Sequence, residues 1–85
     1  MKILYSKTSL KFLAKIEKKQ RERIKAAIEA LTLTPPQGDI KLLQGYAETY
    51  RLRVGSYRII YKTTVENNID ILYIIDIGNR GDIYK

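Results

Sequence analysis

The chain has 85 residues, which predicts a single domain over residues 1–85, because so short a chain has room for one hydrophobic core. It carries 16 Lys plus Arg against 9 Asp plus Glu, and this charge of +7 favours a polyanionic partner such as nucleic acid. Neither Cys nor His is present, which excludes disulfides, catalysis by thiol or imidazole, and ordinary zinc sites.

The first half of the chain predicts one strand followed by amphipathic helix. Lys2 to Tyr5 forms a short strand, and the Ser and Thr residues after it can cap a helix. Apolar residues then recur at helical spacing in two stripes: Leu10, Phe12, Leu13 and Ile16, followed by Ile24, Ala27, Ile28 and Leu31. Since no Gly or Pro interrupts this region, it is either a helical hairpin broken near Lys18 to Gln20 or one long helix.

A dense run of charge occupies residues 15–25 of this helical region. Its basic members are Lys15, Lys18, Lys19, Arg21, Arg23 and Lys25. The run is either the hydrated side of the helices or a surface that attracts phosphate groups. Pro35 and Pro36 end the helical region, and we expect Leu42 and Leu43 to anchor the following loop to the core.

A β-hairpin is predicted over residues 50–61, where residue types alternate on both sides of Gly55-Ser56. Gly55 suits the first central position of a type II′ turn. Such a turn fixes the cross-strand pairs as Val54 with Tyr57, Arg53 with Arg58, and Arg51 with Ile60.

This register puts Arg51, Arg53 and Arg58 on one face of the hairpin and the apolar and aromatic residues on the other. Like charges opposite each other on a sheet repel, and a multivalent anion would relieve the repulsion between Arg53 and Arg58. Arginine suits phosphate, because its planar fork donates paired hydrogen bonds. The alternative is an ordinary solvated face with the side chains splayed apart.

The last part of the chain predicts a tight turn and a buried strand. Asn67-Asn68 suits a turn because Asn tolerates positive φ, and Ile69 to Ile77 has the composition of a strand covered on both faces. A two-residue turn places four residues of this strand on the arginine face, namely Ile71, Tyr73, Ile75 and Ile77. Either the register slips, or that face is partly apolar and covered by a partner.

The order β-α-α-β-β-β predicts an α+β fold, in which both N-terminal helices pack on one face of an antiparallel sheet. We also expect a cytoplasmic protein without a membrane anchor, because the sequence has no long apolar run and no signal peptide.

Three segments resemble the RelE-type toxins of the RelE/ParE toxin–antitoxin superfamily. Lys41 to Gly45 is similar to the family's Lys-Leu-x-Gly element, and Tyr50 to Tyr61 is close to its commonest hairpin pattern. Ile77 to Arg80 followed by Tyr84 favours the ribonuclease branch of the superfamily. The resemblance spans the chain and implies the small microbial-ribonuclease-like fold, which has the element order given above.

The resemblance also implies a function and a set of site residues. RelE-type toxins cleave messenger RNA in the ribosomal A site, without a metal or other cofactor, and a RelB-like antitoxin inhibits them in a hetero-oligomer. By position, Arg51 and Arg53 match basic residues of the active-site strand, and Arg58 matches a phosphate-binding arginine. Arg80 matches an arginine that assists the leaving group, and Tyr84 matches a tyrosine that orients the substrate base.

The sequence departs from this family at the general base. Well-studied members carry lysines where this chain has Arg51 and Arg53, and arginine is a poor base. The candidates are Arg53, the upstream carboxylate of Glu48, or a group of the ribosome. Two other functions stay open: a ParE-like inhibitor of DNA gyrase that is not an enzyme, and an RNA-binding relative with weak catalysis.

Overall fold

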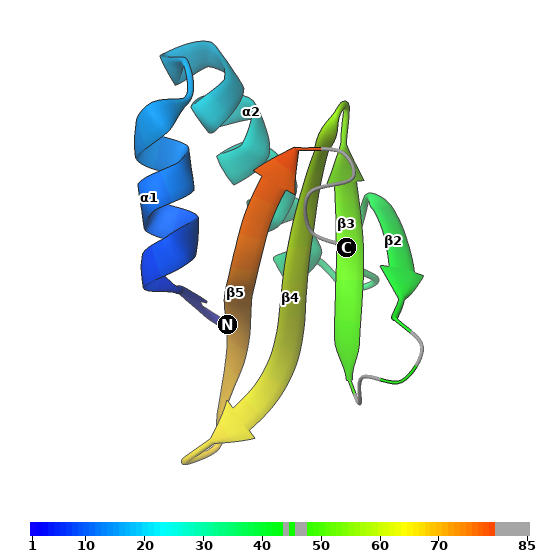
Figure 1. The fold of residues 1–85 in the computed structure, drawn as a ribbon. Helices are drawn as coiled ribbons and strands as arrows, with labels where there is room; N and C mark the ends of the chain where they lie inside the picture. The colour runs from blue at the N-terminus through cyan, green and yellow to red at the C-terminus, as the bar shows by residue number, and fades with distance from the viewer. Residues whose placement is uncertain (44, 46–47, 80–85) are drawn as a thin grey trace.

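The protein is a five-stranded sheet with two helices on one of its faces (Figure 1). The structure is a computed structural model that describes residues 1–43, 45 and 48–79. In chain order the elements are β1 (Lys2–Tyr5), α1 (Lys7–Lys15), α2 (Lys18–Glu29), a 3-10 turn (Ala30–Thr32), β2 (Asp39–Leu42), β3 (Thr49–Val54), β4 (Tyr57–Glu66) and β5 (Ile69–Asn79). Within these described ranges, neither helix is long and apolar enough to cross a membrane.

The strand order is β1-β5-β4-β3-β2, which confirms the α+β class and corrects the predicted sheet in two respects. First, β1 lies parallel to β5, so the sheet is mixed. No short turn joins these two strands, so nothing local in the sequence determines their relative direction. Second, Asp39–Leu42 is an additional strand, which pairs antiparallel with β3 at the edge of the sheet.

The extra strand also corrects the expected anchor of the loop before the hairpin. Leu42 is 56% exposed at the end of the edge strand, and Leu43 is only half-buried. Ile40 packs against the core instead, since it points to the same side of the sheet as Leu52, its partner on β3.

The helical region is a hairpin of two helices, and the break falls at Ile16 and Glu17, slightly before the predicted position. Helix α1 begins after Ser6, whose side chain accepts a hydrogen bond from the backbone nitrogen of Ser9 at 3.1 Å. At its other end, Arg21 of α2 donates from Nε to the Leu13 carbonyl at 2.8 Å and from Nη2 to the Ile16 carbonyl at 3.0 Å. These bonds satisfy carbonyls that the end of α1 leaves free, so the chain breaks the helix without Gly or Pro.

Both predicted tight turns are present. The β3–β4 hairpin has the predicted register, with Arg53 opposite Arg58, and Gly55 has the positive φ of 60° that a type II′ turn requires. In the β4–β5 hairpin, Asn67 and Asn68 have φ values of 50° and 63°, as in a type I′ turn.

A β-bulge resolves the register conflict on β5. Tyr61 pairs with Ile74 but its neighbour Ile60 pairs with Asp76, so β5 contains one extra residue at Ile75. Between the Asn67-Asn68 turn and the bulge, the strands pair as a two-residue turn predicts, so Ile71 lies on the arginine face. After it, the strand is flipped and Ile77 points into the core, where it is 3% exposed. Of the two alternatives, the register slip therefore holds for Ile77, whereas Ile71 stays on the arginine face, which is partly apolar there.

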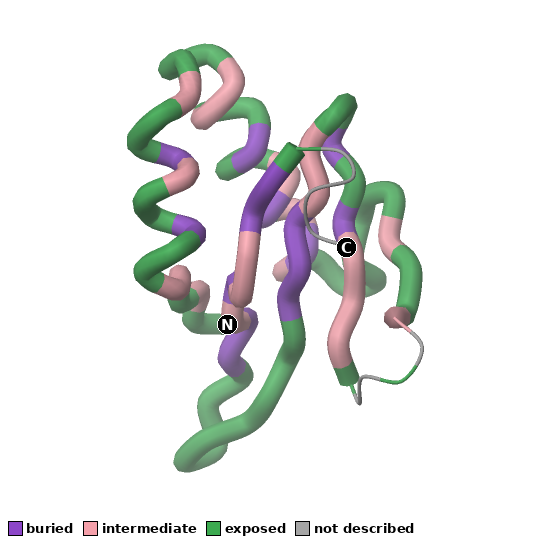
Figure 2. The backbone as a smooth tube through the Cα atoms, viewed as in Figure 1, coloured by how far each residue is buried: buried purple, intermediate pink, exposed green. Residues whose placement is uncertain are grey.

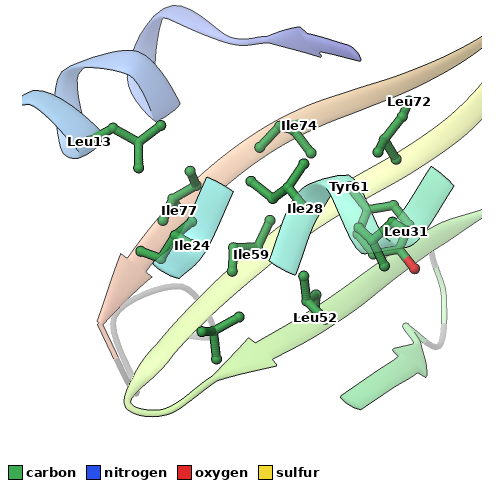
Figure 3. Packing of buried hydrophobic residues seen from close by; sticks show 11 residues of the cluster. Leu13, Ile24, Ile28, Leu31, Leu52, Ile59, Tyr61, Leu72, Ile74 and Ile77 are labelled. Atoms are coloured by element: carbon green, nitrogen blue, oxygen red, sulfur yellow. The ribbon is translucent and has the colours of Figure 1, made fainter. Parts of the chain in front are cut away.

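The core lies between the helices and the sheet (Figures 2 and 3). Figure 2 shows buried segments along the inner side of the helices and the middle of β4 and β5. Figure 3 shows side chains of α1, α2 and three strands meeting there, and the cluster comprises Leu13, Ile24, Ile28, Leu31, Leu52, Val54, Ile59, Tyr61, Leu72, Ile74 and Ile77. Since alternate residues of the hairpin fill this core, the residues between them are left for the opposite face.

Candidate functional site

Polar residues form a row across the sheet next to the β3–β4 turn, on the face opposite the helices. The row runs through Asp39 of β2, Arg53 of β3, Arg58 of β4 and Gly78 of β5, each paired with the next. The row therefore has a carboxylate at one end, two arginines in the middle and a residue without a side chain at the other end. Arg51 lies in the next row of the same face, opposite Ile60.

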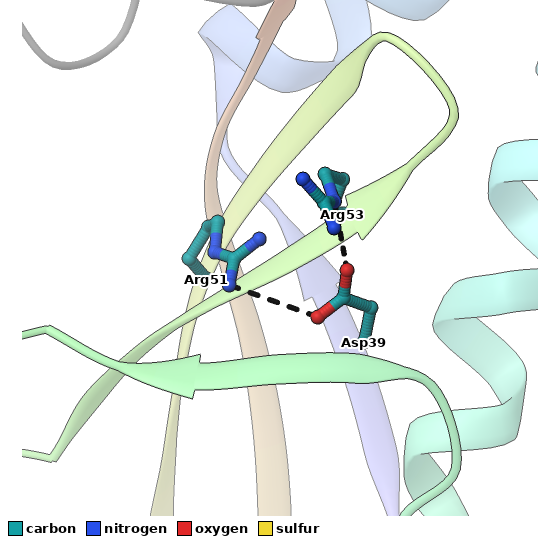
Figure 4. A network of polar contacts seen from close by, with 3 residues as sticks. All are labelled: Asp39, Arg51 and Arg53. Atoms are coloured by element: carbon teal, nitrogen blue, oxygen red, sulfur yellow. Dashed lines mark hydrogen bonds and ion pairs between the residues drawn. The ribbon is translucent and has the colours of Figure 1, made fainter.

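The carboxylate of Asp39 contacts two of the arginines (Figure 4). Arg53 donates from Nε to Asp39 Oδ2 at 2.7 Å, and Arg51 Nη2 lies 3.7 Å from Asp39 Oδ1. Arg51 is nearly buried, with 12% of its side chain exposed, whereas about half of Arg53 is exposed. A pair as exposed as Asp39–Arg53 adds only about 0–1 kcal/mol to stability, so its main effect is to orient the guanidinium groups.

Arg58, unlike Arg53, is not paired with the Asp39 carboxylate. Its Nη1 atom is buried and has no hydrogen-bond acceptor among the described residues. A buried donor without an acceptor is costly, on the order of 1–3 kcal/mol, so this atom marks a place where an anion would be stabilised. Beside it, a pocket of about 340 Å³ is lined by Arg53, Gly55, Ser56 and Arg58. This pocket has room for a phosphate group between the two arginines.

The structure brings together three of the five residues predicted for the site. Arg51, Arg53 and Arg58 share one face, as the alternation predicted. Arg80 and Tyr84 lie outside the described residues, and their roles stay predictions. Glu48, one of the candidate bases, directly precedes β3, whose opposite end carries Arg53.

Asp39 is the site residue that sequence reasoning missed. Its signal was the polar–apolar alternation of Asp39–Leu42, which is typical of a short strand. The contact with Arg53 also depends on the register between β2 and β3, which no tight turn of two residues fixes.

Tyr5 and Tyr61, the two tyrosines whose pKa is raised, lie away from this row. Burial raises the pKa of Tyr61 to about 12, and its neighbour Tyr50 adds to the increase. These two rings stack with their centroids 5.4 Å apart, and Tyr61 belongs to the core cluster on the helix side of the sheet. Burial also raises the pKa of Tyr5, with a smaller contribution from Glu29. We therefore assign neither Tyr5 nor Tyr61 to the arginine site.

Comparisons with known proteins identify the family. The family described as "ParE toxin of type II toxin-antitoxin system, parDE" matches residues 3–84. Toxin RelE3 of Methanocaldococcus jannaschii is 38% identical over 88 residues, which cover 99% of this chain and 96% of the relative.

Solved structures show the same similarity. The toxin in the RelB–RelE antitoxin–toxin complex from Methanococcus jannaschii matches with a TM-score of 0.70 and 33% identity, over 95% of this chain and 94% of that one. A chain of the archaeal RelE–RelB complex from Pyrococcus horikoshii OT3 matches with a TM-score of 0.73 and 26% identity, over 95% of this chain and 96% of that one. The YoeB/ParE toxin from Agrobacterium tumefaciens shares the fold, with a TM-score of 0.76 at 21% identity. The match covers 94% of this chain and 99% of that one. Together with the family match, these similarities show that the chain belongs to the ParE toxin family of type II toxin–antitoxin systems, as a RelE-type member of the RelE/ParE superfamily.

Proposed function

We propose that this toxin is a ribosome-dependent endoribonuclease that cleaves messenger RNA in the A site. The ribose 2′-hydroxyl attacks the adjacent phosphorus, the bond to the 5′-oxygen breaks, and the products are a 2′,3′-cyclic phosphate and a free 5′-hydroxyl. The observation that carries the proposal is the pair Arg53–Arg58, which lines a pocket with room for a phosphate group, together with the buried Nη1 of Arg58, which has no acceptor among the described residues.

In this mechanism the arginines stabilise the charge that develops on the phosphoryl oxygens. Arg58 and Arg53 bind the non-bridging oxygens from two sides of the pocket, and Arg51 adds positive charge from the next row. Fixed cations of this kind need no reorganisation during the reaction, and such electrostatic stabilisation is often the largest catalytic effect. Arg80 assists the leaving oxygen and Tyr84 orients the substrate base, as the family pattern implies.

The proton of the 2′-hydroxyl needs an acceptor, and the structure changes the candidates for that role. Glu48 lies at the wrong end of β3 to serve a phosphate held by Arg53. Arginine is a poor base, and Arg53 is already paired with the carboxylate of Asp39. Asp39 is the carboxylate that contacts the arginines, so it replaces Glu48 as the protein's own candidate, with a ribosomal group as the alternative.

A RelB-like antitoxin is the proposed partner, in a hetero-oligomeric toxin–antitoxin complex. The relatives from Methanococcus jannaschii and Pyrococcus horikoshii were solved as complexes of RelE with RelB. The physical basis in this chain is its charge of +7 and its arginine row, which attract an acidic segment.

The second candidate function is inhibition of DNA gyrase, and the family description as a ParE toxin favours it. To separate the two, the chain is induced in cells that lack the antitoxin, and 5′ ends of a translated reporter messenger RNA are mapped while plasmid supercoiling is measured. We expect growth arrest with new 5′ ends confined to translated codons and unchanged supercoiling. Growth arrest with relaxed plasmids and no new ends would support gyrase, and no arrest would leave a weakly catalytic RNA-binding relative.

A further inference from the structure

The guanidinium group of Arg23 in α2 lies against the turn that closes the arginine hairpin. A Cβ atom placed on Gly55 would be 2.9 Å from Nη2, 3.0 Å from Nη1 and 3.2 Å from Cζ of Arg23. These short distances show that the guanidinium end of Arg23 lies next to the glycine. Gly55 therefore serves the turn through its positive φ and also leaves the space that Arg23 occupies.

Unlike Arg21 and Arg53, Arg23 has no hydrogen-bond or ion-pair partner among the described residues. Arg21 bonds the carbonyls at the end of α1, and Arg53 bonds Asp39. Arg23 makes no hydrogen bond or ion pair with the residues that the structure describes, and it is exposed. Within the described part of the chain, no acceptor therefore competes with a ligand for its donors.

The position of Arg23 connects the charge run on the helices to the arginine row on the sheet. Gly55 touches both, because it lines the pocket of Arg53 and Arg58 and contacts Arg23. Since Gly55 has no side chain, nothing at this residue rises between the pocket and the guanidinium group. On α2, Lys19 lies one turn before Arg23 on the same side of the helix, and it is also exposed.

We propose that Arg23 binds the RNA phosphate next to the one held by Arg53 and Arg58, so that the RNA strand crosses the hairpin turn toward α2. This inference rests on the proposed function, because it assumes RNA in the arginine pocket. Under this proposal, the basic residues of the charge run have different roles. Arg21 stabilises the helical hairpin, Arg23 binds substrate, and Lys19 extends the substrate-binding surface. A guanidinium group suits this role because it can donate two parallel hydrogen bonds to one phosphate.

The test measures binding of a labelled 2′-O-methyl RNA octanucleotide, which the toxin cannot cleave, across a series of salt concentrations. The variants are Arg23→Ala, Arg23→Lys and Arg58→Ala, with Lys25→Ala as the matched control. Lys25 is exposed on the same helix two residues further on, so it removes the same charge from a different side. Circular dichroism melts check that each variant is folded.

We expect Arg23→Ala to weaken binding and to reduce the slope of log K against log salt by about 0.7, the value for one contact to a single strand. Arg23→Lys should keep most of the slope, and Lys25→Ala should stay close to the wild type. Equal slopes for Arg23→Ala and Lys25→Ala, with a reduced slope for Arg58→Ala, would overturn this inference alone. Wild-type slopes for both Arg58→Ala and Arg23→Ala would overturn the proposed phosphate site together with the inference.

Discussion

At the scale of single residues, the site depends on how a short row of charges is balanced. Asp39 neutralises part of the positive charge of Arg51 and Arg53, whereas Arg58 has a buried donor for which residues 1–43, 45 and 48–79 provide no acceptor. The protein thus holds two arginines in place with its own carboxylate and leaves the third for a ligand. Most of the binding energy for an anion should therefore come from Arg58.

The substitution Asp39→Asn tests the role of the carboxylate, because it keeps the size of the side chain and removes its charge. If Asp39 accepts the 2′-hydroxyl proton, cleavage should fall at least about a hundredfold, as expected for loss of a general base. Stability should change by no more than about 1 kcal/mol, because the ion pair is half-exposed.

The matched control is Asp70→Asn, which removes an exposed carboxylate from β5 opposite Val65, near the other end of the sheet. This variant should cleave like the wild type. A wild-type cleavage rate in Asp39→Asn as well would show that the carboxylate takes no part in the reaction.

The sequence predicted the three arginines of this face but not the carboxylate. Arg51, Arg53 and Arg58 lie within one hairpin, so alternation and one tight turn were sufficient to place them together. Asp39 comes from a separate edge strand, and its position next to Arg53 depends on a pairing between segments that no short turn connects.

At the scale of elements, the helical hairpin depends on Arg21. Its side chain spans from α2 to the carbonyls of Leu13 and Ile16, eight and five residues earlier in the chain. The sequence left one long helix and a hairpin as alternatives, because it has no Gly or Pro at the break. The deciding feature was a side chain that bonds the backbone of the preceding helix, and periodicity does not reveal such a contact.

Arg21→Ala should therefore destabilise the protein by about 1–3 kcal/mol, the usual range for losing hydrogen bonds from a charged group. Urea unfolding followed by circular dichroism measures this change. Lys18→Ala is the control, because Lys18 is exposed on the same helix and should alter stability by less than about 0.5 kcal/mol. Equal stability of the two variants would mean that the Arg21 bonds do not hold the helices together.

At the scale of the whole molecule, the helix side of the sheet provides stability and the opposite face carries the proposed chemistry. The difference between the two faces follows from the alternation of residue types along the strands, which is visible in the sequence. It also depends on the bulge in β5, which the sequence does not reveal. Ile75 is the same residue type as Ile74 before it, so composition could not mark which of the two is the extra residue. The parallel direction of β1 was missed because its partner β5 is far away in the sequence.

The buried Tyr61 predicts how the stability of the fold depends on alkaline pH. Its pKa rises from 10.0 to about 12 in the folded protein, so the fold favours the neutral phenol. The corresponding stabilisation is complete below pH 10 and is lost as the pH rises toward 12. It amounts to at most about 3 kcal/mol, since one pH unit corresponds to ~1.4 kcal/mol.

Urea unfolding of the wild type and Tyr61→Phe at a series of pH values tests this dependence. Phenylalanine cannot ionise, so the difference in stability should be constant below pH 10, and the wild type should lose stability relative to the variant between pH 10 and 12. The comparison cancels the titration of groups that the two proteins share. A constant difference up to pH 12 would contradict the effect of burial on Tyr61.

The most direct test of the central claim is cleavage of a messenger RNA by purified toxin on programmed ribosomes, mapped by primer extension. We expect cuts in the A-site codon, far fewer cuts on free messenger RNA, and a loss of cleavage of at least about a hundredfold for Arg58→Ala. Lys62→Ala, which removes an exposed charge from the same face of β4, should cleave like the wild type. Absence of A-site cuts, or equal cleavage by Arg58→Ala and the wild type, would contradict the account.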